Sequence, residues 1–177
     1  DASVCVQTSD NHPRGFGGLG LRIHPLLKYS IVHRQATEAF QLLIFRVSQV
    51  TISLGYLSPS ATASQTRMML ETVRVHCNGR SVLLGDLNAR HPTWDHGSNI
   101  RGTNLTSWAL KNGWTVNAPS SPTFSRRGFT STVDLIVSKG LNPPTAQILY
   151  GEWNDHTDHF AVGATLGNET NIQMDLG

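Results

Sequence analysis

The residues best suited to hydrolytic chemistry lie at the end of an apolar run, in SVLLGDLN (81–88). Asp86 and Asn88 follow Val82 to Leu84, and residues two apart in a strand project to the same side. A carboxylate beside a carboxamide can orient a water molecule and transfer its proton. The alternative is an Asp-Leu-Asn turn cap, and the pair alone favours the turn.

Two other segments combine acids with imidazoles. NDHTDHFAV (154–162) contains Asp-His twice and then alternates like a strand, a composition suited to a divalent cation or a phosphate oxygen. Asp134 interrupts the apolar run STVDLIVS, and a buried carboxylate needs a partner, for which His159 is a candidate. The alternative for 154–162 is a polar loop that happens to contain histidines. The alternative for Asp134 is an aspartate that points to solvent from an edge strand.

The elements that must position these residues are mostly strands. Short apolar runs recur between clusters of Gly, Pro, Asn and Ser. A helix is predicted over 64–77, with Met68 and Met69 on one face, and a second one is predicted to end at Gly113. Hairpin-linked strands with two helices favour an α+β sandwich over a doubly wound fold. Since neither a repeat nor a linker divides the 177 residues, we expect a single domain over 1–177.

Composition narrows the class of protein. Charged residues make up 15% of the chain and the formal net charge is +2, which excludes the strong positive field of an architectural nucleic-acid protein. Cys5 and Cys77 lie in apolar contexts, which favours two buried free thiols over one disulfide. Since no apolar run is long enough to span a bilayer, we expect no membrane partner.

The order of four motifs then becomes informative: GYLSP, GDLNARHPTWD, PTF followed by STVDLIVS, and TDHFAV. This order resembles the endonuclease/exonuclease/phosphatase superfamily, and most closely the apurinic-type endonuclease domain of non-LTR (LINE-like) retrotransposons. The resemblance runs from Asp1 to about Leu166. It implies a DNase I-like, four-layer α/β/β/α sandwich, in which two packed mixed sheets are flanked by outer helices.

The resemblance implies a catalytic set. Tyr56 would contact the scissile phosphate. Asp86 would align or deprotonate the attacking water, or protonate the leaving oxygen, and Asn88 would help to hold the phosphate and that water. Asp134 would orient the imidazole of His159, which would stabilise the charge that develops on the phosphorane.

The implied cofactor is Mg²⁺ or Mn²⁺, and the implied partner is DNA. Asp158 matches a position near the metal, and we prefer it to Asp155 because an apolar strand follows it directly. Arg126 and Arg127 lie where retrotransposon relatives meet DNA, although a solvated basic turn is the alternative. A retrotransposon origin would imply a nuclear or cytoplasmic location. The sequons at Asn104 and Asn168 leave secretion open.

Two departures from the family pattern bear on activity. Thr8 stands where the metal-binding glutamate is expected, and a hydroxyl cannot replace its charge. Asp10 is the nearest carboxylate that could substitute for this glutamate. Because the glutamate is replaced, we expect metal binding to be weak or absent. The first strand and helix of the family are missing before this stretch, so a homodimer or another partner is expected to complete the sheet.

These features predict an endonuclease domain that hydrolyses DNA phosphodiester bonds by a divalent-metal mechanism, impaired by Thr8 and by the missing strand. The alternative is a catalytically inactive descendant that acts as a nucleic-acid-binding or protein-interaction module. A phosphoesterase acting on a lipid or sugar phosphate is a third reading, but no residue favours it over DNA.

Overall fold

The computed structural model describes residues 2–7, 18–142, 144–149, 157–166 and 171–173. Thr8 and Asp10, the positions expected at the metal site, lie outside these ranges, as does Asp155.

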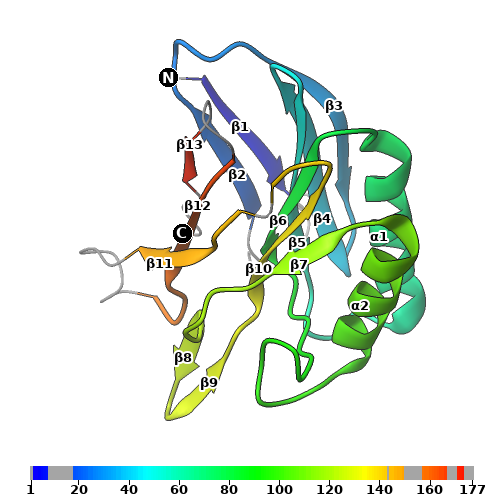
Figure 1. The fold of residues 1–177 in the computed structure, drawn as a ribbon, viewed down its shortest axis with the longest axis vertical. Coiled ribbons are helices and arrows are strands. Elements are labelled where there is room, and N and C mark those ends of the chain that lie inside the picture. The colour runs from blue at the N-terminus through cyan, green and yellow to red at the C-terminus, as the bar shows by residue number, and fades with distance from the viewer. Residues whose placement is uncertain (1, 8–17, 143, 150–156, 167–170, 174–177) are drawn as a thin grey trace.

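A six-stranded sheet forms the centre of the molecule, with strand order β3-β4-β5-β6-β10-β7 (Figure 1). The strands are β3 (Tyr29–Ala36), β4 (Phe40–Val47), β5 (Val50–Leu57), β6 (Ser81–Asp86), β10 (Asp134–Lys139) and β7 (Thr115–Asn117). Only β5 and β6 pair in parallel; the other neighbours are antiparallel. Helices α1 (Ala63–His76) and α2 (Ile100–Asn112) both cover one face of this sheet.

Two small sheets lie against the opposite face. One pairs β1 (Ala2–Gln7) with β2 (Gly18–Ile23), and the other contains β11 (Gln147–Leu149), β12 (Ala161–Thr165) and β13 (Asn171–Gln173). A separate hairpin, β8 (Phe124–Arg126) with β9 (Phe129–Ser131), projects from the body of the domain (Figure 1).

The four inner strands of the central sheet, β4, β5, β6 and β10, are buried on both faces, which explains their near-continuous apolar sequences. In β4, Leu42 and Ile44 belong to the core shared with the helices, whereas Leu43 and Phe45 belong to the core shared with the second layer. The α+β class expected from the sequence is therefore confirmed.

Helix α1 begins with a capping box between Thr62 and Gln65. The predicted apolar face was partly wrong: Met69 is fully buried, but 52% of Met68 is exposed. The buried stripe also includes Thr66 and Val73, at the spacing of three to four residues that one helix face requires. Gly113 ends α2 in the left-handed conformation (φ 70°), as predicted.

One glycine sets the spacing of the strands at the candidate site. Gly85 has φ 144°, and a Cβ there would collide with the backbone carbonyl of Gly55. Strands β5 and β6 therefore approach closely, one residue before Asp86 and one before Tyr56. Neither α1 nor α2, the helices of the described residues, is long and apolar enough to cross a membrane.

Candidate active site

Two aspartates meet at one edge of the central sheet. Asp86 is the last residue of β6 and Asp134 the first of β10, and the two are direct partners in the antiparallel register. The segment that carries His159 crosses this edge and pairs with Phe124 through an isolated β-bridge. The ring of Phe124 also packs edge-on against the imidazole, with the centroids 5.0 Å apart.

His159 lies between the two carboxylates. Its Nδ1–H donates to Oδ2 of the fully buried Asp134 at 3.0 Å, so that Nε2 faces Asp86 Oδ2 at 4.0 Å. Burial opposes a positive charge on the ring. The hydrogen bond and charge of Asp134, with the charges of Asp86 and Asp158, outweigh burial and raise the pKa of His159. Asp134 therefore fixes the orientation of the imidazole and favours its cationic form.

Asn88 holds the carboxylate of Asp86. Its backbone N–H donates to Oδ1 at 3.0 Å, and its Nδ2 donates to Oδ2 at 3.1 Å and to the carbonyl of Leu57 at 3.0 Å. Burial, followed by repulsion from Asp134, raises the pKa of Asp86 to about 7, although His159 and Asn88 counteract part of this rise. A carboxylate with such a pKa can accept or donate a proton at neutral pH.

Tyr56 completes the group of expected catalytic residues. It is partly buried in β5, and both its burial and the negative charge of Asp86 raise the pKa of its phenol. The structure thus gathers all five candidates at one edge of the sheet: Tyr56, Asp86, Asn88, Asp134 and His159.

Thr123 binds the backbone on both sides of the His159–Asp134 pair, at Asp134 itself and at Phe160, the residue after His159. Its Oγ1 accepts hydrogen bonds from the backbone N–H groups of Val133 and Asp134, each at 3.0 Å, and its carbonyl accepts one from the N–H of Phe160 at 2.7 Å. Sequence reasoning assigned no role to Thr123, although it is the threonine of the PTF motif. A side chain that acts through backbone groups leaves no pattern of its own in the sequence.

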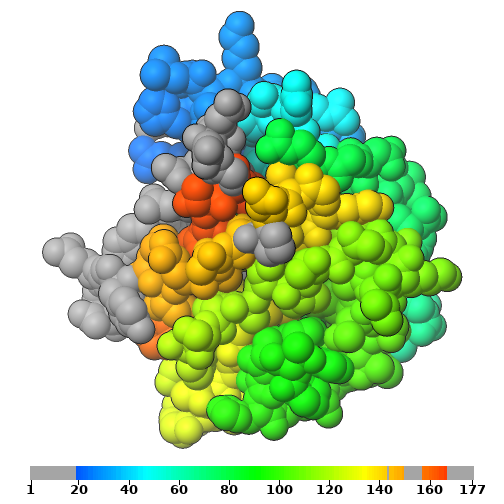
Figure 2. All heavy atoms as spheres, in the orientation of Figure 1, coloured from blue at the N-terminus to red at the C-terminus, as the bar shows by residue number. Residues whose placement is uncertain are grey.

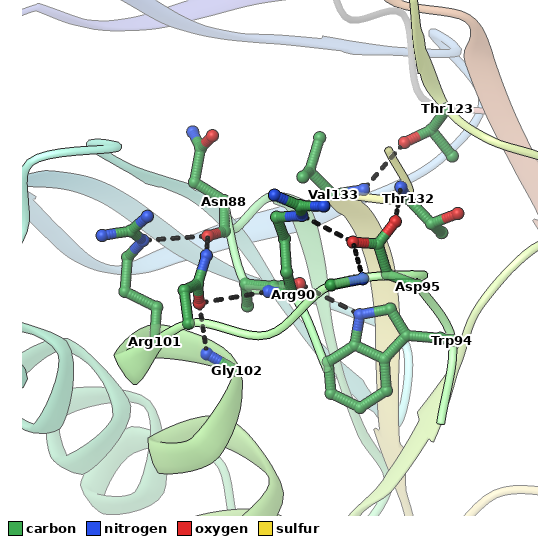
Figure 3. A network of polar contacts seen from close by, with 12 residues as sticks. Asn88, Arg90, Trp94, Asp95, Arg101, Gly102, Thr123, Thr132 and Val133 are labelled. Carbon is green, nitrogen blue, oxygen red and sulfur yellow. Dashed lines mark hydrogen bonds and ion pairs between the residues drawn. The ribbon is translucent and has the colours of Figure 1, made fainter. Parts of the chain in front are cut away.

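A buried carboxylate connects the loop after Asn88 to Thr132, which lies just before β10 (Figure 3). Asp95, whose side chain is 2% exposed, accepts hydrogen bonds from Arg90 Nε at 2.6 Å, Thr132 N at 3.0 Å and Gly97 N at 3.3 Å. Burial opposes the charge of Asp95, but these hydrogen bonds prevail and lower its pKa. Sequence reasoning missed this network too, although GDLNARHPTWD contains Arg90 and Asp95.

Replacing Asp95 with alanine is expected to reduce the free energy of unfolding by about 3 kcal/mol. The substitution leaves two backbone N–H groups without their acceptor and Arg90 without its counter-charge. Urea unfolding would measure the change. The control is Glu71→Ala, which breaks an exposed ion pair with Arg74 and should cost less than about 0.5 kcal/mol. Equal losses in the two variants would contradict the role given to Asp95.

The remaining candidates lie on the periphery. Asp158 precedes His159, but its carboxylate pairs with Arg126 Nε at 3.4 Å, and both side chains are largely exposed. Arg127 is exposed at the tip of the β8–β9 hairpin, where it and Gly128 both have positive φ. The cationic group of Arg90 packs on Phe129 of this hairpin, 5.0 Å from the ring centroid. In the space-filling view, the yellow hairpin lies beside the green segment that follows Asn88 (Figure 2).

The described residues only partly fit a divalent cation. Among them, no three His, Cys, Asp or Glu side chains form a cluster that could hold a metal ion. Both oxygens of Asp86 already accept hydrogen bonds from Asn88, and Asp134 Oδ2 accepts one from His159. Asp134 Oδ1 is buried without a hydrogen-bond partner in the structure. These carboxylates do not make a cation site by themselves.

Comparison with known proteins identifies the family to which the chain belongs. The family model described as endonuclease-reverse transcriptase matches residues 50–162, more than half of the chain. The chain belongs to this family. The match contains every expected site residue except Thr8 and Asp10, so the family relationship and the candidate site involve the same part of the molecule. A comparison with curated protein sequences gave no match.

Solved structures confirm the DNase I-like fold. The endonuclease domain of TRAS1, a telomere-specific non-LTR retrotransposon, superposes with a TM-score of 0.67 at 17% identity, over 95% of this chain and 81% of that one. CdtB, the biologically active subunit of cytolethal distending toxin, superposes with a TM-score of 0.57 at 18% identity, over 92% of this chain and 72% of that one. An endonuclease/exonuclease/phosphatase family protein from Leptotrichia buccalis superposes with a TM-score of 0.56 at 13% identity, over 93% of this chain and 71% of that one.

Proposed function

We propose that this chain is a retrotransposon-type endonuclease domain that hydrolyses DNA phosphodiester bonds with the help of Mg²⁺ or Mn²⁺. The observation that carries the proposal is the arrangement of His159 between Asp134 and Asp86, with the pKa of Asp86 raised to about 7. Membership of the endonuclease-reverse transcriptase family and the fold shared with the TRAS1 endonuclease domain support DNA as the substrate.

Each side chain then has a defined task. Asp86 takes the proton of the attacking water or supplies one to the leaving oxygen, and Asn88 keeps its carboxylate in place. His159, held as a cation by Asp134, stabilises the negative charge that develops on the phosphorane oxygens. Tyr56 contacts the phosphate from β5. A bound divalent cation would neutralise phosphate charge and would need ligands beyond the described carboxylates.

A second candidate function is favoured by one observation, the threonine at position 8. Without the expected glutamate, the cation loses its main carboxylate ligand. The chain would then be a catalytically inactive descendant that binds nucleic acid or a protein through the same surface.

Nicking of a supercoiled plasmid in Mg²⁺ and in Mn²⁺ tests the two functions. If the chain is an endonuclease, the wild type nicks, and both Asp86→Ala and His159→Ala abolish nicking. A folded wild type that does not nick in either metal would reject the first function. Titration with duplex DNA at two salt concentrations would then identify a nucleic-acid-binding module, because phosphate contacts weaken as salt rises.

Replacing Thr8 with glutamate is expected to strengthen divalent-cation binding and to raise nicking by about 10²-fold, because it adds the missing carboxylate. Isothermal titration with Mn²⁺, beside nicking rates, would measure both effects. Thr8→Gln is the matched control, since it has the same shape without the charge. If Thr8→Glu does not improve metal binding, the alignment of the opening strand is wrong.

Replacing Arg126 and Arg127 together with alanine is expected to weaken DNA binding at all sequences. The slope of log K against log salt concentration should fall in magnitude by about 2, one unit for each lost phosphate contact. Fluorescence anisotropy of labelled duplex DNA would measure this salt dependence, in EDTA so that the DNA is not cleaved. The paired change Arg67→Ala and Arg74→Ala on α1 is the control, and an equal effect there would show that only net charge matters.

Association with a second copy of the chain or with another partner stays a prediction. The molar mass in solution, measured by light scattering, tests it.

A further inference from the structure

The backbone of Asn88 has an unusual conformation. Its φ is 44°, in the left-handed region that few residues other than glycine adopt. In this conformation its N–H and Nδ2 donate to the two oxygens of Asp86. Asparagine adopts this region more readily than most residues do, and contacts with neighbouring groups stabilise the conformation further. The orientation of Asp86 therefore depends on whatever fixes Asn88.

Two side chains from the start of α2 fix the carbonyl of Asn88 (Figure 3). Arg101 Nε donates to this oxygen at 2.8 Å, and Asn99 Nδ2 donates to it at 2.9 Å. Arg101 also reaches the carbonyl of Ala61 through Nη1 at 3.4 Å, so it connects Asn88 to the residue before the cap of α1. Asn99 has other tasks as well, because its Oδ1 caps α2 through the N–H of Gly102.

The stability of the helix does not explain an arginine at this position. Arg101 is the second residue of α2, and a cation in the first turn is disfavoured by the positive end of the helix dipole. In the part of the chain that the structure describes, no carboxylate forms a salt bridge with it. Its hydrogen bonds go to backbone carbonyls, and Asp86 interacts with it only through charge. A residue kept in an electrostatically poor position is a candidate for a functional role.

We infer that Arg101 is a positioning residue of the hydrolytic site. It fixes Asn88 by binding its backbone carbonyl, and Asn88 in turn holds both oxygens of Asp86 through its N–H and its side-chain amide. This inference rests on the proposed function. Arg101 is given no contact with the substrate, so its effect on catalysis passes through Asn88 and through the charge that it presents to Asp86, which Arg101→Lys retains.

Nicking kinetics of Arg101→Met, which keeps the apolar stem, test the inference. We expect kcat to fall roughly 10- to 100-fold with little change in KM, because the reacting groups are misplaced while DNA contacts persist. Arg101→Lys should recover part of the loss through a single N–H donor. Arg67→Met, an exposed arginine on α1, is the matched control and should nick like the wild type.

A double-mutant cycle shows whether Arg101 acts through Asn88. Asn88→Ala removes the amide contact with Asp86 Oδ2 but keeps the backbone N–H and carbonyl of residue 88, so in this background Arg101→Met should lower kcat by a clearly smaller factor than in the wild type. Additive effects of the two substitutions would overturn the inference. A fall in kcat that only tracks a fall in melting temperature would overturn it as well, because it would mean a structural role.

A spectroscopic measurement separates this inference from the proposed function. The side-chain amide of Asn88 donates to Asp86 and Leu57, so its protons should exchange slowly with water in the wild type. NMR should show faster exchange in Arg101→Met and unchanged exchange in Arg67→Met. If the wild type does not nick, the proposed function fails, while this result still decides whether Arg101 positions Asn88. Unchanged exchange in Arg101→Met overturns the inference.

Discussion

Replacing Asp134 with asparagine is expected to lower the kcat of plasmid nicking by about 10³-fold. The side chain keeps its size, so the packing around this fully buried position is preserved. The negative charge of Asp134, which raises the pKa of His159 against the effect of burial, is lost, and the cationic form of the ring becomes less favoured. A neutral imidazole stabilises a phosphorane far less well than a cation.

The pH dependence provides the check on this prediction. Because the pKa of His159 falls in Asp134→Asn, the residual activity relative to the wild type should rise as the pH is lowered from 8 to 5.5. Combining Asp134→Asn with His159→Ala should lower kcat little beyond His159→Ala alone, since the two residues act as a unit. Glu71→Gln, on the exposed face of α1, is the control for loss of an acid. Activity of Asp134→Asn within tenfold of the wild type would exclude the assigned role.

The second large effect concerns stability, and its sign is unusual for an acidic residue. The pKa of Asp86 is raised from its ordinary value to about 7 in the folded protein. Between about pH 4 and pH 7 the folded state therefore holds a proton that the unfolded chain releases. The free energy of unfolding falls as the pH rises through this window. The raised pKa of His159 acts in the same direction, since its stabilising cation is lost at high pH.

We therefore expect Asp86→Asn to be more stable than the wild type at pH 8, by about 2 kcal/mol, and similar to it at pH 5. The estimate allows for the hydrogen bond from Asn88 Nδ2 that an amide at position 86 no longer accepts. Urea unfolding of both proteins at the two pH values would measure the difference. Glu71→Gln should leave the pH dependence unchanged. If Asp86→Asn loses as much stability between pH 5 and pH 8 as the wild type does, the buried charge of Asp86 is not the cause.

The placement of Asp86 at the end of a buried strand was predictable, but its contact with Asn88 does not arise from strand periodicity, because β6 ends at Asp86 and Asn88 lies beyond it with a φ of 44°. The two-residue spacing of Asp86 and Asn88 after an apolar run, and the isolated acid Asp134 in another, indicated side chains at one end of a buried sheet. The pairing of Asp134 with His159, suggested by the cost of burying a carboxylate, is present in the structure. The order of the motifs added Tyr56, whose contact with a phosphate stays a prediction.

The residues that hold the site were not predictable in the same way. Thr123, Asn99 and Arg101 act on backbone N–H and carbonyl groups, which every residue type presents, so their spacing carries no chemical signature. Asp158 was expected near a metal ion, but the structure pairs its carboxylate with Arg126, a contact between segments more than thirty residues apart in sequence. Met68 was misplaced because the buried face of α1 is formed by Thr66, Met69, Leu70 and Val73, which leaves Met68 on the solvent side.

The direct register between Asp86 and Asp134 has a consequence for how such chains can diverge. The distance between the two acids is set by ladder hydrogen bonds and not by the 47 residues that separate them in the chain. Insertions in those intervening loops that do not contact the site should therefore be tolerated, since lengthening a surface loop adds little closure entropy. A single deletion inside β10 would turn alternate side chains to the other face of the sheet, and the acid would leave the site in one evolutionary step.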